Sequence, residues 1–174
     1  MRSFQKDHHK WLQEGGIEHP THLETLQQPE QQRRIEWLKE NTTPSTLDVL
    51  DIGCSWGYIL NQLNGVRGWG VDISEESIAL AKERFPQLHF TCADVLKGLP
   101  FKESSFDNVI ESEIVDHLLW WAEIETALKE AVRITYDRVL ITLPYRKDDK
   151  CALCFKHKWI PADKKIGKIL TWLM

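Results

Sequence analysis

The stretch VLDIGCSWGY, residues 49 to 58, carries the clearest structural signal in the sequence. An apolar run ends in Asp51, and Gly53 and Gly57 follow with three residues between them. A strand that runs into a glycine turn and then a helix is how α/β proteins hold a nucleotide. The stretch therefore predicts an α/β fold with a nucleotide- or nucleoside-binding turn.

Outward from this stretch, apolar runs alternate with amphipathic ones. We expect strands over 47–52, 66–73, 88–94, 106–112 and 137–144, and helices over 29–41, 58–63, 74–85 and 118–134. Pro29 suits the first turn of its helix, and Ser74 suits the N-cap position of another. Strands that alternate with helices indicate a Rossmann-like, doubly wound, mostly parallel sheet with helices on both faces. Its ligand site should lie at the carboxyl ends of the strands.

Composition narrows the class of protein. The chain has 174 residues, of which 42% are hydrophobic and 28% charged, as in an ordinary single globular domain. Its net charge of −4 disfavours nucleic acid as a partner. We expect no membrane association, because no apolar run approaches about 18 residues and the N-terminus has no apolar segment. The four cysteines do not form a disulfide framework, which favours a cytoplasmic location.

We expect one domain over 1–174, with an N-terminal helical cap (1–46), a cofactor-binding core (47–144) and a C-terminal segment (145–174). A short helix is expected over 4–14 and irregular structure over 17–23. Helical spacing of apolar residues in KKIGKILTWLM predicts an amphipathic helix near the C-terminus.

Three kinds of nucleotide site compete for the glycine turn. A phosphate-binding P-loop needs Gly-Lys-Ser/Thr, but Tyr58 follows Gly57. A dinucleotide site needs G-x-G-x-x-G, but Ser55 and Tyr58 occupy the second and third glycine positions. The remaining possibility is a nucleoside without phosphates. Acidic residues end the next strands, and one at the end of the second strand can accept hydrogen bonds from both ribose hydroxyls.

At this point a resemblance to a family emerges. VLDIGCSWGY resembles the first motif of class I S-adenosylmethionine-dependent methyltransferases, usually D/E-x-G-x-G-x-G. GVDIS resembles their second motif, CADVLKGLPFKESSFDNVIESEIVDHL their third and fourth strands with the link between them, and DRVLITLP their fifth strand. The similarity covers about residues 47–144. The ordered set is more specific than the first motif alone.

The resemblance implies S-adenosylmethionine as the cofactor and assigns roles to individual residues. Asp51 and the 53–57 turn would surround the methionine portion, and the acid that ends the second strand would hold the ribose. The acid after the third strand would meet the adenine, and the acid in the fourth would line the floor beneath the methyl group. The implied cofactor-binding set is Asp51, Gly53, Cys54, Ser55, Gly57, Asp72, Ile73, Asp94, Val95 and Glu111. Ser55 departs from the family pattern. A serine can keep the turn if its φ stays negative, so we expect a weaker constraint there and no loss of binding.

Methyl transfer from a sulfonium is an in-line displacement in which the protein mainly aligns the reactants. His117 is a candidate general base, since its ordinary pKa suits proton removal near neutral pH, and Glu111 is a second candidate at the methyl group. A structural role for His117, packing the turn against the next helix, is the stronger interpretation. We expect one of Trp120 and Trp121 to pack on the sheet.

The acceptor is expected to be a small molecule. The N-terminal segment often selects the substrate in this family, so His8, His9, His19 and His22 are candidate contacts or surface residues. Cys151, Cys154 and His157 could bind zinc, but they supply only three ligands and are interpreted as ordinary residues. No metal is expected. The alternatives to an enzyme of this family are a nucleoside-binding protein without turnover and an NAD(P)-dependent oxidoreductase.

The C-terminal segment differs most from the family pattern. Family members usually continue past the fifth strand with a helix and an antiparallel strand pair, whereas only residues 145–174 remain here. We therefore expect a shortened domain without that pair. The fifth strand would then lie at an open sheet edge, which either forms a homodimer or is covered by 145–174.

Overall fold

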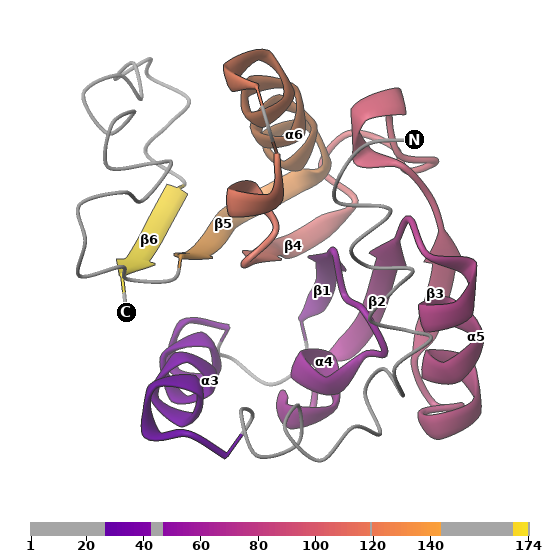
Figure 1. Cartoon of the computed structure of the whole chain (residues 1–174), viewed down its shortest axis with the longest axis vertical. Coiled ribbons are helices and arrows are strands. Elements are labelled where there is room, and N and C mark those ends of the chain that lie inside the picture. The colour runs from indigo at the N-terminus through magenta and orange to yellow at the C-terminus, as the bar shows by residue number, and fades with distance from the viewer. Residues whose placement is uncertain (1–26, 43–46, 119, 144–168, 174) are drawn as a thin grey trace.

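The computed structural model describes residues 27–42, 47–118, 120–143 and 169–173. These residues form one six-stranded sheet in the order β3-β2-β1-β4-β5-β6 (Figure 1). Every neighbouring pair in it is parallel. The strands are β1 (Asp48–Ile52), β2 (Arg67–Asp72), β3 (His89–Cys92), β4 (Phe106–Ser112), β5 (Thr135–Leu143) and β6 (Ile169–Leu173).

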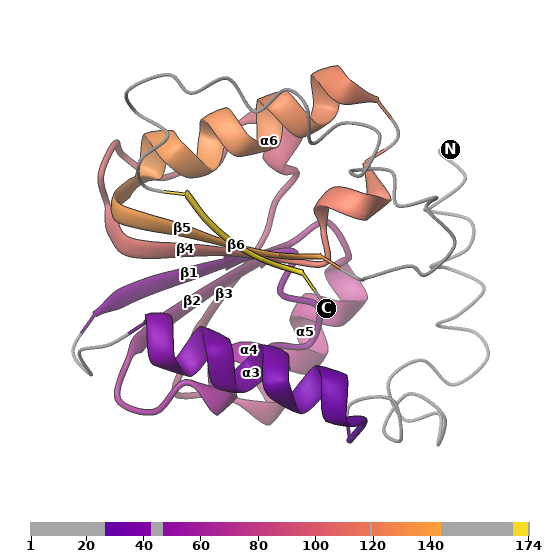
Figure 2. The same ribbon diagram turned by 90° about the vertical axis from the view of Figure 1, so that its left-hand side faces the viewer.

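Helices cover both faces of this sheet. They are α3 (Pro29–Asn41), α4 (Tyr58–Gln62), α5 (Glu75–Arg84) and α6 (Trp121–Ile134). Figure 2 shows α6 on one face and α3, α4 and α5 on the other. The chain runs outward from β1 to β3 and then returns to β4 beside β1, so the strand order reverses between β1 and β4. The Rossmann-like, doubly wound fold is confirmed, and the reversal marks the carboxyl ends of β1 and β4 as the ligand-binding edge.

Alternating side chains along β1 build two apolar clusters. Leu50 and Ile52 pack with α6 residues such as Ile124, whereas Val49 packs with Leu38 of α3 and Leu60 of α4. Since successive side chains of a strand point to opposite faces, Asp51 lies on the α3 face. Burial on both faces explains why β1 is an almost continuous apolar run.

Local signals account for the helix starts. Pro29 occupies the first turn of α3, as expected. The hydroxyl of Ser74 accepts a hydrogen bond from the N–H of Ser77 at 3.1 Å, which confirms it as the N-cap of α5. The expected strands and helices of the core all form, with ends displaced by a few residues.

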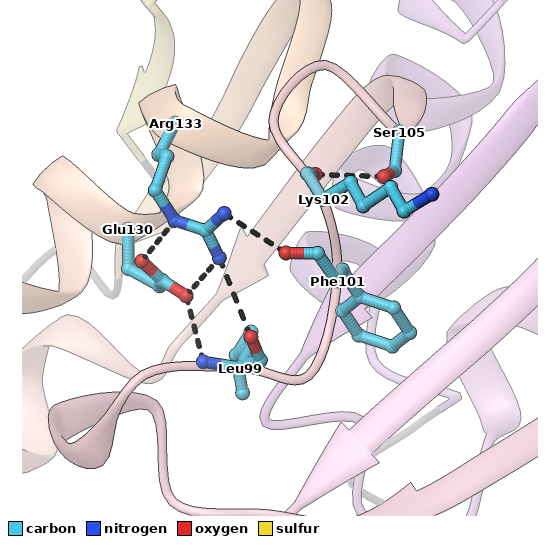
Figure 3. Close-up of polar contacts among 6 residues, drawn as sticks. All are labelled: Leu99, Phe101, Lys102, Ser105, Glu130 and Arg133. Atoms are coloured by element: carbon cyan, nitrogen blue, oxygen red, sulfur yellow. Dashed lines mark hydrogen bonds and ion pairs between the residues drawn. The ribbon is translucent and has the colours of Figure 1, made fainter.

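The link between β3 and β4 is fastened to α6 (Figure 3). Glu130 accepts a hydrogen bond from the N–H of Leu99 at 2.6 Å, and Arg133 donates to the carbonyl of Phe101 at 2.8 Å. Glu130 and Arg133 also pair with each other at 2.6 Å. The resulting hydrogen bonds lower the pKa of Glu130 and raise that of Arg133. Side chains of one helix thus form hydrogen bonds with the backbone of Leu99 and Phe101 in the LPF stretch.

The C-terminal helix prediction is wrong where the structure describes that segment. Residues 169–173 form β6, which pairs in parallel with β5 from Val139 to Leu143. The segment ILTWL is rich in residues that favour strands, and the edge of β5 offers it a complete hydrogen-bonding ladder. The edge of β5 is therefore covered by the chain itself, one of the two expected outcomes. A second additional strand is not present among the described residues.

Several expectations fall on residues that the structure does not describe. The helix over 4–14, the irregular stretch 17–23 and most of the segment 145–168 are among them, so the division into cap, core and C-terminal segment stays a prediction. None of the helices in the described ranges is both long enough and apolar enough to cross a membrane.

Candidate cofactor site

The turn after β1 folds back onto β2. The N–H groups of Gly53 and Cys54 both donate to the carbonyl of Val71, at 2.8 and 3.0 Å. Gly53 has φ +76° and Gly57 has φ +82°, the left-handed region that glycine adopts without strain. A Cβ on Gly57 would lie 2.6 Å from the ring of Phe90, so only glycine allows α4 to begin this close to β3.

Ser55, between the two glycines, is also left-handed, with φ +48°. The negative φ that was the stated condition for a serine to keep the turn is therefore not found. Its N–H donates to Asp72 Oδ2 at 2.8 Å, a charge-assisted bond that offsets the cost of the left-handed backbone. The turn keeps its conformation without glycine at this position because the neighbouring strand supplies a partner.

Asp72, at the end of β2, links two elements of the site. Its Oδ2 accepts from Ser55, and its Oδ1 accepts from the N–H of Ser74 at 2.9 Å, at the cap of α5. Two carboxylate oxygens offer about four acceptor positions, so both retain capacity for a ligand hydroxyl. Ile73 follows with 44% of its surface exposed. Together they present fixed acceptors beside an exposed apolar side chain.

Cys54 contributes its backbone to the turn. Its side chain is buried, and burial raises the pKa of the thiol well above its ordinary value. A Cβ on Gly70 would lie 2.6 Å from its sulfur, so the thiol fills the space that this glycine leaves. Packing is the role that the structure gives to this side chain.

Asp94 lies two residues beyond the end of β3 and begins a short 3-10 helix, Val95–Lys97. Its Oδ1 accepts from the N–H of Leu96 at 3.0 Å, and Lys97 lies 3.4 Å from its Oδ2. Val95 is buried against the α6 face. The carboxylate therefore shapes this turn at the same edge of the sheet as Asp72.

Two fully buried carboxyls flank the start of the site. Within the described residues, both oxygens of Asp51 and of Glu111 have no hydrogen-bond partner. Burial raises the pKa of each to about 8; for Asp51 the charge of Arg34 opposes this rise and that of Asp72 adds to it. Ile52 is in register with Glu111, and alternation from Val109 places Glu111 on the α6 face, opposite Asp51. The two carboxyls thus line different faces of the same strand pair.

The turn after β4 lies against the glycine turn. A Cβ on Gly53 would approach the Ile114 side chain to 3.0 Å, so the two turns are in close contact. Glu113, which precedes Ile114, has φ +57°. His117 ends the next 3-10 helix (Val115–His117) with an exposed side chain, and its N–H donates to the Ile114 carbonyl at 3.0 Å. His117 is thus placed one turn beyond the contact with Gly53.

Sequence reasoning missed one buried charge in this region. Arg34 of α3 is 4% exposed, and its Nη1 lies 2.6 Å from Glu113 Oε2. Helical spacing places Arg34 on the same face as Leu38, which is buried against β1. An arginine four residues before a core leucine was the available signal.

At the other end of the turn, Trp120 is 69% exposed at the N-cap of α6, whereas Trp121 packs on the core, as expected for one of the pair.

The expected cofactor residues therefore converge on the carboxyl edge of β1, β2, β3 and β4. The four N-terminal histidines and the Cys151, Cys154 and His157 group lie outside the described residues. The described ranges contain no cluster of three His, Cys, Asp or Glu side chains suited to a metal ion.

This arrangement is that of a Rossmann-like nucleoside-binding domain. A family model described as a methyltransferase domain matches residues 49–137, and the chain belongs to this family of class I, S-adenosylmethionine-dependent methyltransferase domains. The cofactor of the family is S-adenosylmethionine. Membership in the family does not support the alternative of a nicotinamide cofactor at the glycine turn.

Individual relatives are more distant. The ubiquinone biosynthesis O-methyltransferase of Nitrosococcus oceani is 21% identical over 76% of this chain and 56% of its own length. The solved structure of a SAM-dependent methyltransferase from Methanosarcina mazei has a TM-score of 0.59 at 22% identity, covering 68% of this chain and 62% of that one. The crystal structure of the [4+2]-cyclase SpnF has a TM-score of 0.55 at 21% identity, covering 61% and 41%. The chain thus spans about half the length of the curated relative, and these likenesses show the fold alone.

Proposed function

We propose that the protein transfers the methyl group of S-adenosylmethionine to a small-molecule acceptor. The observation that carries the proposal is the junction of Asp72 with the 53–57 turn, because it places fixed acceptors beside a glycine-lined backbone. Asp51 and Glu111 add buried carboxyls without partners in the described residues, which suits a cationic ligand. The residues present therefore fit this cofactor.

Each residue at the edge has a separate part in binding. Asp72 accepts hydrogen bonds from the ribose hydroxyls with the lone pairs that Ser55 and Ser74 leave free. Ile73 packs its exposed side chain on the base, and Asp94 with the backbone at Val95 meets the adenine amino group. Asp51 and the turn of Gly53, Cys54, Ser55 and Gly57 surround the methionine portion.

When bound, the cofactor supplies an electrophilic methyl carbon, so the protein needs to align the acceptor and keep the site dry. Glu111 lies beneath this region, and a cation beside it would favour its ionised form and lower its pKa from about 8. His117 is exposed one turn beyond the Gly53 contact, where it can remove a proton from an acceptor or fix the turn.

Calorimetry tests the cofactor first. S-adenosylhomocysteine should bind with a micromolar Kd and NADH should not bind. Tight binding of NADH without a response to S-adenosylhomocysteine would overturn the proposal. The product, S-adenosylhomocysteine, is a better probe than S-adenosylmethionine because it has no methyl group to transfer during the titration.

Turnover is tested by screening small acceptors for release of S-adenosylhomocysteine. Glu111→Gln and His117→Ala should each lower kcat more than they weaken cofactor binding if these groups act at the methyl. Binding of the cofactor with no turnover on any acceptor class would favour a nucleoside-binding protein. A cytoplasmic location, which the spacing of the cysteines in the sequence suggests, belongs to the same proposal.

A further inference from the structure

We propose that the Arg34–Glu113 ion pair is a positioning device: it holds the turn after β4 in the conformation that the cofactor requires. The inference rests on the proposed function, since it concerns the same site. It assigns a binding role to a helix residue and a loop residue that lie beside the glycine turn and outside the expected cofactor-binding set.

The backbone of Glu113 is left-handed. Its φ of +57° is a conformation that costs a residue with a Cβ about 1–2 kcal/mol, so something must hold it. Two contacts do so: the N–H of Glu113 donates to the Thr142 carbonyl at 3.0 Å, and its carboxylate meets Arg34 at 2.6 Å. The side-chain hydroxyls of Ser112 and Thr142 share a further hydrogen bond of 2.8 Å just before the turn.

The turn after β4 contacts the glycine turn through the residue that follows Glu113. Ile114 follows directly and packs on Gly53, with almost no space between them. A shift of the turn would therefore move Ile114 either into the glycine turn or away from it. His117, at the end of the next 3-10 helix, would move with it.

Arg34 is the more deeply buried partner of the pair. Its side chain is 5% exposed, whereas that of Glu113 is 29% exposed, so the pair is screened from water on the helix side. Removing one partner of such a pair leaves the other charge without compensation, which is costly. The charge of Arg34 also opposes the rise in the pKa of Asp51 that burial causes. The pair couples α3, which precedes β1 in sequence, to the geometry of the cofactor edge.

A double-mutant cycle on cofactor affinity tests this inference. Arg34→Gln and Glu113→Gln should each raise the Kd for S-adenosylhomocysteine about tenfold, and the double variant should do so by about the same factor rather than a hundredfold. Arg34→Lys, which keeps the charge, should recover most of the affinity. Hydrogen exchange of residues 113–117 should quicken in both single variants without any ligand.

The control is Arg67→Gln, because Arg67 forms a 2.6 Å ion pair with Asp48 at the opposite end of the sheet. It should leave both affinity and exchange of 113–117 unchanged. Affinities equal to wild type in the single variants, measured well below the unfolding temperature, would mean that the pair only stabilises the fold and would overturn the inference. A loss in Arg34→Gln with none in Glu113→Gln would also overturn it, by indicating direct contact of Arg34 with the ligand. Failure of the wild-type chain to bind S-adenosylhomocysteine would instead count against the proposed function, while the exchange measurement would still test the pair.

Discussion

The carboxylate of Asp72 accepts a hydrogen bond from the backbone N–H of Ser55 at 2.8 Å, which ties the end of β2 to the turn after β1. The same carboxylate caps the entry to α5 through Ser74. One side chain therefore fixes two backbone segments and still has lone pairs directed away from them. Because Asp72 shapes the turn and, in the proposed binding mode, also contacts the ribose, its removal should affect binding in two ways.

Asp72→Ala should weaken the binding of S-adenosylhomocysteine at least tenfold while the fold survives. Each charge-assisted hydrogen bond lost is worth roughly 1.5–3 kcal/mol. Asp72→Asn keeps one acceptor oxygen, so its affinity for S-adenosylhomocysteine should lie between those of the wild type and Asp72→Ala. Calorimetry gives the affinities and circular dichroism checks the fold.

The matched control for this change is Asp107→Ala. Asp107 also accepts a hydrogen bond from a backbone N–H, that of Asp48 at 2.8 Å, but at the amino end of the sheet. Its loss should lower stability without changing the affinity for the cofactor. Unchanged affinity in Asp72→Ala would place the ribose elsewhere.

The left-handed conformation of Ser55 leads to a second prediction. Ser55→Gly should raise the free energy of unfolding by about 0.5–1 kcal/mol, because glycine removes the Cβ penalty at φ +48° and its greater unfolded-state entropy offsets only part of this gain. Urea unfolding measures the change. Cofactor affinity should stay within about threefold of wild type, since the N–H that Asp72 holds is retained.

Ser104→Gly serves as the comparison, because Ser104 has φ +52° in the link between β3 and β4. It should give a similar gain in stability and no change in affinity. A Ser55→Gly variant less stable than wild type would show that the backbone penalty of the serine Cβ is smaller than the entropy that glycine adds to the unfolded state.

The contrast between Ser55 and Gly57 shows what the sequence could and could not predict. The turn, β1 and the acid that ends β2 follow from local patterns, namely an apolar run and the spacing of two glycines. The φ of Ser55 depends on a partner in another strand, and the Arg34–Glu113 pair joins residues far apart in the chain. Neither contact leaves a local pattern, which is why neither the left-handed backbone of Ser55 nor the ion pair was predicted.

The C-terminal segment illustrates the same limit for secondary structure. Residues 169–173 carry apolar residues at helical spacing, yet they also favour strands, and periodicity does not decide between the two in so short a run. Pairing with β5 decides it. Tertiary context therefore overrides the local helical pattern there.

The buried carboxyls predict a pH dependence of stability. Burial raises the pKa of Glu111 from 4.5 to about 8, so the folded state holds a proton that the unfolded state has lost between these values. The stability that this proton contributes is fully present below about pH 4 and declines as the pH rises to about 8. Asp51, whose pKa is raised from 3.8 to about 8, acts in the same direction.

Glu111→Gln should therefore flatten the pH profile of the unfolding free energy. Relative to wild type, the variant should gain more than about 1 kcal/mol on going from pH 5 to pH 8, measured by urea unfolding without cofactor. Glu83→Gln, on the exposed side of α5, is the control and should keep the wild-type slope. Parallel profiles for Glu111→Gln and wild type would contradict a protonated Glu111.

The last prediction concerns the edge of β5, which β6 covers from Val139 to Leu143. An uncovered apolar strand offers unpaired N–H and C=O groups to another chain. Removal of residues 169–174 should therefore speed hydrogen exchange of the β5 amides and raise the apparent mass in light scattering as chains pair along the open edge. Thr171→Pro keeps the chain at full length and removes one backbone donor from β6, so it should give a weaker effect of the same kind. In the intact chain the β5 amides should exchange slowly, and an intact monomer whose β5 amides exchange rapidly would show that β6 does not protect this edge in solution.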